Sequence, residues 1–304
     1  MNRKDFLKSS GLLIGGTMLP SKKPMVRFHK TEENESFELK KCVGLEMIKD
    51  DLPLIDKLRM VKDIGFEGIE LNSPTDIDLK EILNAKDSVG IAIPSTINKD
   101  HWKSPLSDPD PKVRESTIRS VAQSLEETKI LGGDTVLVVP GVVNNEVSYA
   151  EAYDNSLDSI RKLIPYAEKT RVKIGIENVW NNFLISPLEA KEFVDKINHP
   201  LIGWYFDIGN VPRYGWPSHW IEVLQHRILK LHMKAFSTKK MNDEGLWKGF
   251  DINLLDEGDI DWKEVIVSLR RINYKEKWFR VEMSGGDRSH LEKISLAMDE
   301  IIKM

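Results

Sequence analysis

The amino-acid sequence predicts an α/β fold, a single-domain (β/α)8 barrel, from three observations. From Lys41 onward, short apolar runs rich in β-forming residues alternate with longer amphipathic stretches. The alternation occurs eight times, and residues 41–304 supply 264 residues, close to the roughly 250 that such a barrel needs. The main alternative, a doubly wound open sheet, usually has a glycine-rich turn after its first strand. Residues 46–51, into which the first expected strand runs here, contain no glycine.

The eight expected strands are short apolar runs bounded by glycine, polar or charged residues, which is the pattern of buried strands. In chain order they are Cys42–Ile48, Gly68–Asn72, Ile91–Ile97, Thr135–Val139, Lys173–Val179, Ile202–Asp207, Ile228–Lys234 and Trp278–Met283.

Amphipathic stretches between these runs predict the helices. Glycine commonly follows the last turn of a helix, and the first three expected helices end in this way. They are Leu54–Ile64 before Gly65, Leu79–Val89 before Gly90, and Lys112–Leu131 before Gly132-Gly133. Further helices are expected near Tyr149–Thr170, Pro187–Ile197, Ser218–His226, Trp262–Ile272 and Arg288–Ile301.

Composition and charge exclude several classes of protein. Hydrophobic residues make up 40% and charged residues 30% of the 304 residues, as in ordinary globular proteins. The single cysteine, Cys42, excludes an intramolecular disulfide and a cysteine-cluster zinc site. Residues 1–30 carry a formal charge of +6 and the remainder carries −10. An acidic body argues against a nucleic-acid partner, because phosphate backbones need a basic surface.

The N-terminal residues predict an export signal. A basic segment, Arg3 to Lys8, precedes a short apolar run that ends at Pro20, and it resembles the bacterial twin-arginine signal with Lys4 at the second arginine. We expect residues 1–20 to be a leader, 21–40 a linker and 41–304 the barrel. The expected location is periplasmic or exported, and cytoplasmic if the leader is not functional. Membrane insertion is not expected, because a spanning helix needs about 20 apolar residues.

Each of the last four expected strands carries a cation-binding residue near its C-terminal end, where barrel enzymes have their active sites. These residues are Glu177, Asp207, His232 and Glu282. Any one alone is compatible with a solvated strand end or a buried ion pair. Together, three buried carboxylates without a cation would repel one another and lose their hydration. A site of three carboxylates and one imidazole suits Mn²⁺, Mg²⁺, Co²⁺ or Zn²⁺.

Four segments that contain these residues resemble the sugar isomerase/epimerase family with a xylose-isomerase-like TIM barrel, which includes D-tagatose 3-epimerase, L-ribulose-5-phosphate 3-epimerase, hydroxypyruvate isomerase and inosose dehydratase. The segments are Ile176-Glu177-Asn178, Phe206-Asp207-Ile208-Gly209-Asn210, His232-Met233-Lys234 and Val281-Glu282, and the resemblance covers residues 41–304. It implies that Glu177, Asp207, His232 and Glu282 bind one divalent metal, most commonly Mn²⁺, and that both glutamates are also acid/base groups. The sequence departs from the family pattern at Asn210, where several epimerases have a substrate-binding histidine, and at Ala235, where aspartate is frequent.

The expected function is a metal-dependent isomerase or epimerase acting on a ketose or keto-sugar derivative. Glu177 and Glu282 would transfer the proton through a metal-stabilised enediolate. Three alternatives remain open: an inosose-dehydratase-like lyase, a metal-dependent hydrolase related to DNA-repair endonucleases, and a sugar-binding barrel without catalysis. The acidic body disfavours the hydrolase, as does the presence of one histidine out of seven at the end of a core strand. Retention of both glutamates disfavours the non-catalytic barrel.

Several further residues are candidates for binding the sugar. Trp102, Trp180, Trp216 and Trp247 lie in predicted loops, where aromatic rings either stack on the C–H faces of sugars or cap the barrel. The other candidates, all expected near the C-terminal ends of strands, are Asn210, Lys234, His101, Asn72 and Glu46.

Two expectations accompany these candidates. Glu46 and Glu70 share the inward phase of their strands, which is also compatible with an internal salt-bridge network. The long loop Ala235–Ile260 is expected to be a lid. The oligomeric state is left open, a homo-oligomer included.

Overall fold

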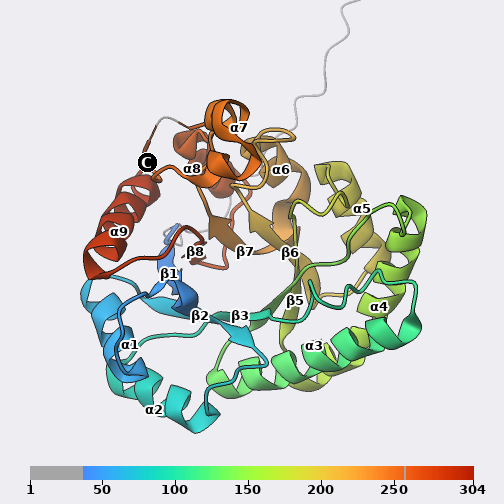
Figure 1. Cartoon of the computed structure of the whole chain (residues 1–304), viewed down its shortest axis with the longest axis horizontal. Coiled ribbons are helices and arrows are strands. Elements are labelled where there is room, and N and C mark those ends of the chain that lie inside the picture. Colours follow the sequence, from blue (N-terminus) through green and yellow to red (C-terminus); the bar gives the residue numbers. More distant parts are fainter. Residues whose placement is uncertain (1–36, 257) are drawn as a thin grey trace, which may run out of the picture. The chain divides into compact units, whose positions relative to one another are not determined.

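Eight parallel strands form a closed barrel in the computed structural model, which describes residues 37–256 and 258–304. The strands follow one another in chain order around the barrel, and the first closes on the last. Figure 1 shows them at the centre with helices around them. The predicted fold class is therefore confirmed. The expected leader at 1–20 and residues 21–36 of the expected linker lie outside the described residues.

The strands are short and almost entirely buried, as expected where helices cover a parallel barrel. They are β1 (Lys40–Gly44), β2 (Gly68–Ser73), β3 (Ser95–Asn98), β4 (Thr135–Val138), β5 (Lys173–Glu177), β6 (Ile202–Asp207), β7 (Ile228–Met233) and β8 (Trp278–Val281).

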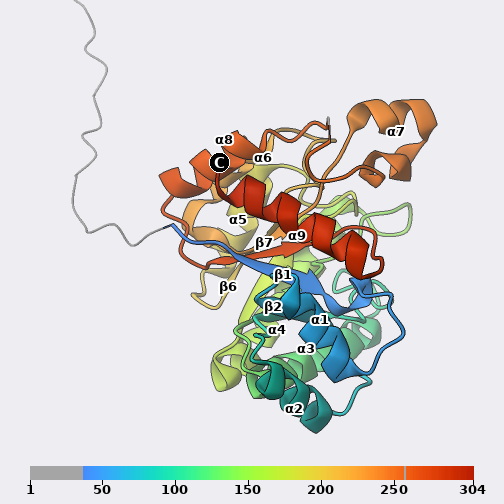
Figure 2. The same ribbon diagram turned by 90° about the vertical axis from the view of Figure 1, so that its left-hand side faces the viewer.

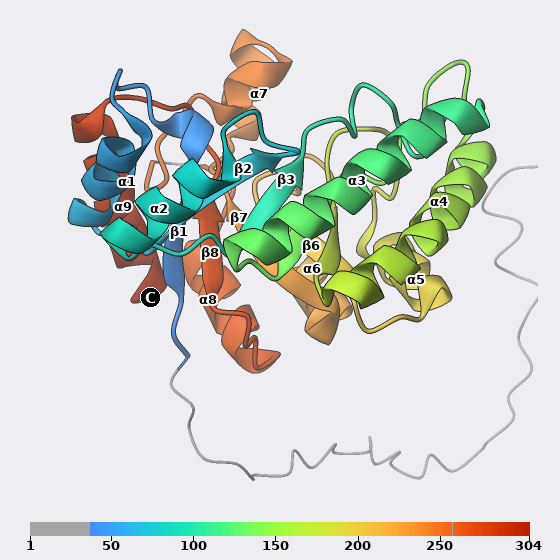
Figure 3. The ribbon, with the colours of Figure 1, turned by 90° about the horizontal axis from the view of Figure 1, so that it is seen from below.

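Helices surround the barrel, and all except the short helix at residues 238–244 pack apolar faces against it; Figure 3 shows several of them from below. They are α1 (Leu54–Asp63), α2 (Leu79–Val89), α3 (Pro111–Leu131), α4 (Tyr149–Thr170), α5 (Pro187–Ile197), α6 (Pro217–Leu224), α7 (Thr238–Glu244), α8 (Trp262–Arg271) and α9 (Arg288–Ile302). Short 3-10 helices are η2 (Leu45–Met47), η3 (Gln225–Arg227) and η4 (Leu246–Phe250).

Six strands are shorter than expected, and in β1 and β3 the difference has a local cause. β1 ends at Gly44, and the chain turns into η2, so residues 45–48 leave the strand. A side chain at Gly44 would overlap the Arg280 guanidinium, so glycine permits this close approach. β3 begins at Ser95, directly after Pro94, because proline has no N–H to donate to the neighbouring strand.

The long connection Ala235–Ile260, expected as a loop, contains α7 and η4. Figure 2 shows α7 projecting away from the ring of helices. None of its seven residues is buried, so α7 contributes little to the core. The expected glycines end α2 and α3, where Gly90 and Gly132 adopt left-handed backbone conformations (φ +70° and +86°).

Strand register brings particular side chains together inside the barrel. Glu177 on β5 pairs in register with Tyr205 on β6, and Asp207 at the end of β6 pairs with His232 on β7. These residues lie on neighbouring strands at one end of the barrel, so their side chains converge.

Among the helices of the described residues, none combines the length and hydropathy that crossing a membrane requires.

Candidate active site

Four potential metal ligands gather at the C-terminal end of the barrel. Glu177 and Asp207 are the last residues of β5 and β6, His232 lies near the end of β7, and Glu282 directly follows β8. One ligand atom from each of the four lies within 4.8 Å of the others. The structure therefore brings together the whole ligand set expected from the sequence. These four residues form the ligand group, and His232 is its only member among the described histidines.

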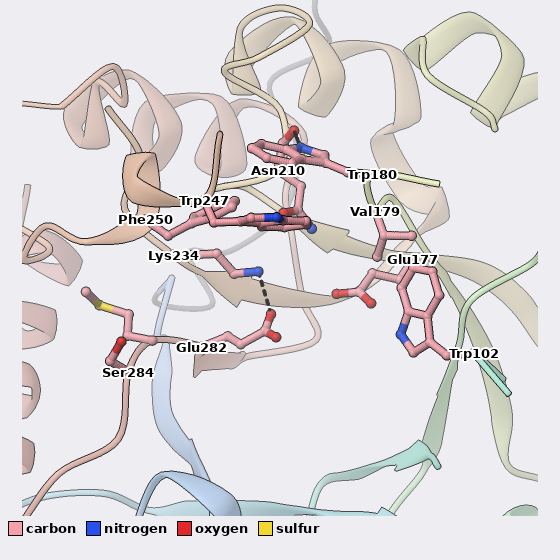
Figure 4. Close-up of a pocket in the computed structure, with 11 residues that line it drawn as sticks. Trp102, Glu177, Val179, Trp180, Asn210, Lys234, Trp247, Phe250, Glu282 and Ser284 are labelled. Carbon is pink, nitrogen blue, oxygen red and sulfur yellow. Dashed lines mark hydrogen bonds and ion pairs between the residues drawn. The ribbon is translucent and has the colours of Figure 1, made fainter. Parts of the chain in front are cut away.

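Short distances link the members of the ligand group. His232 Nδ1 lies 2.9 Å from Glu177 Oε1, 3.3 Å from Glu282 Oε2 and 4.0 Å from Asp207 Oδ2. Lys234 Nζ lies 2.9 Å from both Asp207 Oδ2 and Glu282 Oε2, and Figure 4 shows its contact with Glu282. Lys234, expected near the substrate, thus also contacts two of the expected metal ligands.

The chemistry of the ligand group fits a divalent cation. Three carboxylates and the Lys234 ammonium carry a net charge of −2 when His232 is neutral. Asp207 Oδ2 and Glu282 Oε2 are buried and find no hydrogen-bond donor of normal geometry among the described residues. Buried charged oxygens need a counter-charge. Three oxygens and one imidazole nitrogen are the donors that Mn²⁺, Co²⁺ and Zn²⁺ accept.

Burial and mutual repulsion perturb the acids of the ligand group. Burial, with the negative charges of Glu282 and Asp207 added, raises the pKa of Glu177 to about 7 against the opposing effect of His232. Burial likewise raises the pKa of Asp207. Burial disfavours a charged imidazole, yet hydrogen bonds to Glu177, Glu282 and Glu70 raise the pKa of His232 well above its ordinary value. Glu282 differs: burial would raise its pKa, but Lys234, His232 and Arg280 hold the pKa well below its ordinary value.

Two asparagines fix the position of Asp207. Asn178 donates from Nδ2 to the Asp207 carbonyl (2.7 Å) and accepts the Asp207 N–H at Oδ1 (3.0 Å). The backbone N–H of Asn210 donates to Asp207 Oδ1 (3.0 Å), and its amide donates to the Asn178 carbonyl (2.9 Å). Asn178 directly follows the predicted ligand Glu177, but sequence reasoning assigned it no role of its own. Asn210 lines the pocket as expected, with its amide already engaged by protein.

A cavity of about 440 Å³ opens above the ligand group, and Glu177, Lys234 and Glu282 are part of its wall. Figure 4 shows the indole rings of Trp180 and Trp247 on one side and Trp102 on another. The Trp180 and Trp247 rings stack with centroids 5.4 Å apart, and Trp180 Nε1 donates to the Asn210 carbonyl (3.0 Å). The three tryptophans therefore line the pocket as expected.

Trp216 does not share this position. It stands at the start of α6, is 66% exposed, and packs beside His219.

Glu46 and Asn72 lie outside this pocket, contrary to expectation. Glu46 leaves the strand phase in η2 and forms an ion pair with Arg280. Asn72 shares the inward phase of β2, but it lines a separate cavity of about 260 Å³ together with Glu46 and Lys99. Glu46 and Asn72 thus lie together beside β2, in a cavity separate from the pocket above the ligand group.

His101 is also absent from the pocket wall, because its ring turns into the protein. It is 4% exposed, and its Nδ1 accepts the backbone N–H of Val139 (3.3 Å). Its ring edge meets Trp102, which does line the pocket. His101 therefore supports the pocket wall from behind.

Burial also makes His101 a source of acid sensitivity. Desolvation lowers its pKa to about 4 from an ordinary 6.5, so the unfolded chain binds more protons than the folded one between these values. Stability should therefore fall as the pH falls from 6.5 towards 4, by about 3 kcal/mol from this residue. Unfolding in urea at several pH values checks this, with His101→Asn expected to have a shallower dependence on pH. His226→Asn, at an exposed position, is the matched control. An unchanged dependence in His101→Asn would contradict the prediction.

A buried polar network lies deeper in the barrel, below the ligand group. Glu70 accepts hydrogen bonds from Tyr205 Oη (2.7 Å) and Ser95 Oγ (2.6 Å), and Arg280 Nε lies 3.1 Å from its other oxygen. Burial alone would raise the pKa of Glu70, but His232 and Arg280 lower it to about 2. The internal salt-bridge alternative for Glu46 and Glu70 is thus confirmed. Sequence reasoning missed Arg280 and Tyr205, although both share the inward phase of their strands.

A model of a protein family matches residues 58–301, and that family is described as a xylose isomerase-like TIM barrel. Among curated proteins, an uncharacterised protein of Methanocaldococcus jannaschii is 30% identical over 226 residues, which cover 70% of this chain and 71% of that protein. L-ribulose-5-phosphate 3-epimerase of Salmonella paratyphi C is 22% identical over 258 residues, which cover 78% of this chain and 86% of the enzyme.

Solved structures share the fold. A D-tagatose 3-epimerase-like protein superimposes with a TM-score of 0.71 at 22% identity, covering 87% of this chain and 98% of the other. The IolI protein, solved with a zinc atom, gives a TM-score of 0.69 at 18% identity, covering 87% and 98%. At these identities the likeness shows the barrel, and the chemistry has to be argued from the site.

Proposed function

The chain belongs to the xylose isomerase-like TIM barrel family, and from this premise we propose that it is a divalent-metal-dependent sugar epimerase or isomerase. The observation that carries the proposal is the ligand group: three carboxylates and one imidazole converge beside a pocket that two of the carboxylates line. The epimerases among its curated and structural relatives support the same class of reaction.

In this proposal Glu177, Asp207, His232 and Glu282 hold the metal, and Mn²⁺ is the preferred ion because most donors are oxygen. A divalent cation held there would stabilise the negative charge that develops on substrate oxygens when a neighbouring C–H proton leaves. Lys234 lies within reach of the same region and balances part of the charge of Asp207 and Glu282.

The two glutamates are the proposed acid/base pair. Glu177 and Glu282 come from β5 and β8, and Figure 4 shows their carboxylates on different sides of the space below Trp247. One carboxylate takes the proton from the substrate carbon, and the other, protonated, returns a proton to the opposite face. Return to the same carbon inverts it, which is epimerisation. Transfer of the proton between adjacent carbons on one face would instead be aldose–ketose isomerisation.

The pocket favours an uncharged sugar as substrate. Among its lining residues Lys234 is the only cation, and Asp207 and Glu282 already engage it. A phosphate group would therefore meet carboxylates without a free basic partner, whereas the aromatic wall suits the C–H faces of a free ketose or keto-sugar derivative. The proposal includes export by the N-terminal leader. An exported enzyme would meet free sugars, since phosphorylated sugars are held in the cytoplasm.

Turnover of free and phosphorylated ketoses by Mn²⁺-loaded protein in D₂O tests the proposal. Deuterium should enter the product at the carbon that changes configuration, and free sugars should have the higher kcat/KM. NMR spectroscopy measures both the product and its deuterium content. Elimination of water from a keto-sugar would instead indicate a lyase. Failure to turn over any ketose in the panel, with metal demonstrably bound, would contradict the proposed reaction.

A further inference from the structure

His232 contacts carboxylates through both of its ring nitrogens. Nδ1 faces the ligand group, 2.9 Å from Glu177 Oε1 and 3.3 Å from Glu282 Oε2. Nε2 points the other way, deeper into the barrel, and lies 3.3 Å from Glu70 Oε2. Because a neutral imidazole carries one proton, only one of these nitrogens can offer a lone pair to a cation while the other donates.

Four polar side chains, those of Tyr205, Ser95, Arg280 and His232, surround Glu70. It is fully buried on β2, and its Oε1 accepts hydrogen bonds from Tyr205 and Ser95. Its Oε2 lies 3.1 Å from Arg280 Nε as well as beside His232. It neither lines the pocket nor belongs to the ligand group. This carboxylate is therefore a fixed acceptor for the Nε2 proton of His232.

We propose that Glu70 is a positioning residue that accepts the Nε2 proton of His232 and so keeps the Nδ1 lone pair directed at the metal. The inference rests on the metal site of the proposed function and adds to it a residue outside the ligand group. A ligating imidazole whose other N–H is bonded to a carboxylate is fixed in tautomer and ring orientation, and loss of such a partner costs roughly 10- to 100-fold in metal affinity.

A purely structural role for Glu70 makes a different prediction. Arg280 is 2% exposed and has three carboxylate partners, Glu70, Glu46 and, at 3.9 Å, Glu282. If Glu70 served only as a counter-charge for Arg280, its loss would lower the stability of the fold and leave metal affinity unchanged. Removal of Glu46 would have a similar effect on Arg280, but Glu46 does not contact His232. The matched pair Glu70→Gln and Glu46→Gln therefore separates the two roles.

Titration calorimetry with Mn²⁺ on the folded variants is the first test. Glu70→Gln should bind Mn²⁺ 10- to 100-fold more weakly than the wild type, and Glu46→Gln should keep the wild-type affinity. Equal affinity of Glu70→Gln and wild type, or equal weakening in both variants, would overturn the proposal. A wild-type protein that bound no metal would overturn the metal site itself, and with it the proposed function.

A second measurement does not depend on the folding of any variant. In ¹⁵N-histidine-labelled wild-type protein loaded with Zn²⁺, the NMR spectrum should show His232 with a proton on Nε2 and the metal on Nδ1. A metal on Nε2, or a proton on Nδ1, would overturn the role of Glu70 even if Glu70→Gln fails to fold.

Discussion

Glu177→Gln and Glu282→Gln are each expected to reduce kcat by roughly 10²- to 10⁴-fold, the usual contribution of a general acid or base. Both carboxylates line the pocket, and an amide of the same shape can neither take nor return a proton. The two variants should affect the same step, because a proton removed by one residue must be replaced by the other. Steady-state turnover of the ketose identified by the substrate panel measures the effect.

Metal content separates proton transfer from ligation, since both residues belong to the ligand group. A variant that keeps stoichiometric metal by mass spectrometry and still loses turnover supports the acid/base role. Glu276→Gln is the matched control, because Glu276 pairs with Lys173 and Lys230 and does not line the pocket. Lys230 lies on β7, two residues before the ligand His232. Near-normal turnover in either Glu177→Gln or Glu282→Gln would contradict the assignment.

The barrel could be predicted from the sequence because its signal is repeated. Eight apolar runs separated by amphipathic stretches constrain the topology even where one boundary is displaced. The displaced boundaries depend on details that such a pattern does not contain. Pro94 removes a hydrogen-bond donor and delays β3, and β1 gives way to η2 after Gly44, where a side chain would overlap Arg280. Glu46 consequently occupies a turn, and its side chain faces Arg280.

The ligand group could be predicted because its residues share one simple property, a position at the C-terminal end of a strand. The inward phase of Glu70 is compatible with an internal salt-bridge network, but its partners Tyr205 and Arg280 could not be predicted, because they lie on strands that do not neighbour β2. Glu70 and Tyr205 are 135 residues apart in sequence, and their hydrogen bond crosses the interior of the barrel. Such contacts depend on the stagger between strands, which fixes the layer each inward side chain occupies. The alternation of residues within one strand predicts the direction in which a side chain points, but it does not predict which residues that side chain contacts.

The aromatic side of the pocket shows the same limit. Trp180 and Trp247 were each expected near the site from their positions after strands. Their stacking depends on the fold of the connection 235–260, in which η4 carries Trp247 and Phe250. Because α7 has no buried residue, little apolar burial holds this helix in place, and its course could not be derived from a hydrophobic pattern.

Removal of metal by a chelator is expected to abolish turnover and to lower thermal stability, and Mn²⁺ or Co²⁺ should restore both. Without a cation, three carboxylates face one another in a buried site, with Lys234 and the imidazolium of His232 as their positive neighbours. An ion present at 100 times its Kd stabilises the folded state by about 2.7 kcal/mol. For a barrel of this size that corresponds to roughly 5–10 °C in melting temperature. Turnover assays and calorimetric melting curves measure the two effects.

The loss of activity and the loss of stability should share one cause, and Asp207→Asn tests this. The variant removes a ligand that Asn178 and Asn210 hold in position, and it leaves Glu177 and Glu282 in the pocket. We expect it to melt without metal as the chelated wild type does, and to gain less stability and turnover from added Mn²⁺. Chelator saturated with calcium controls for effects of the chelator itself. Full turnover in protein shown to be metal-free would contradict the metal-dependent reaction, because the carboxylates alone would then have to stabilise a developing negative charge beside their own.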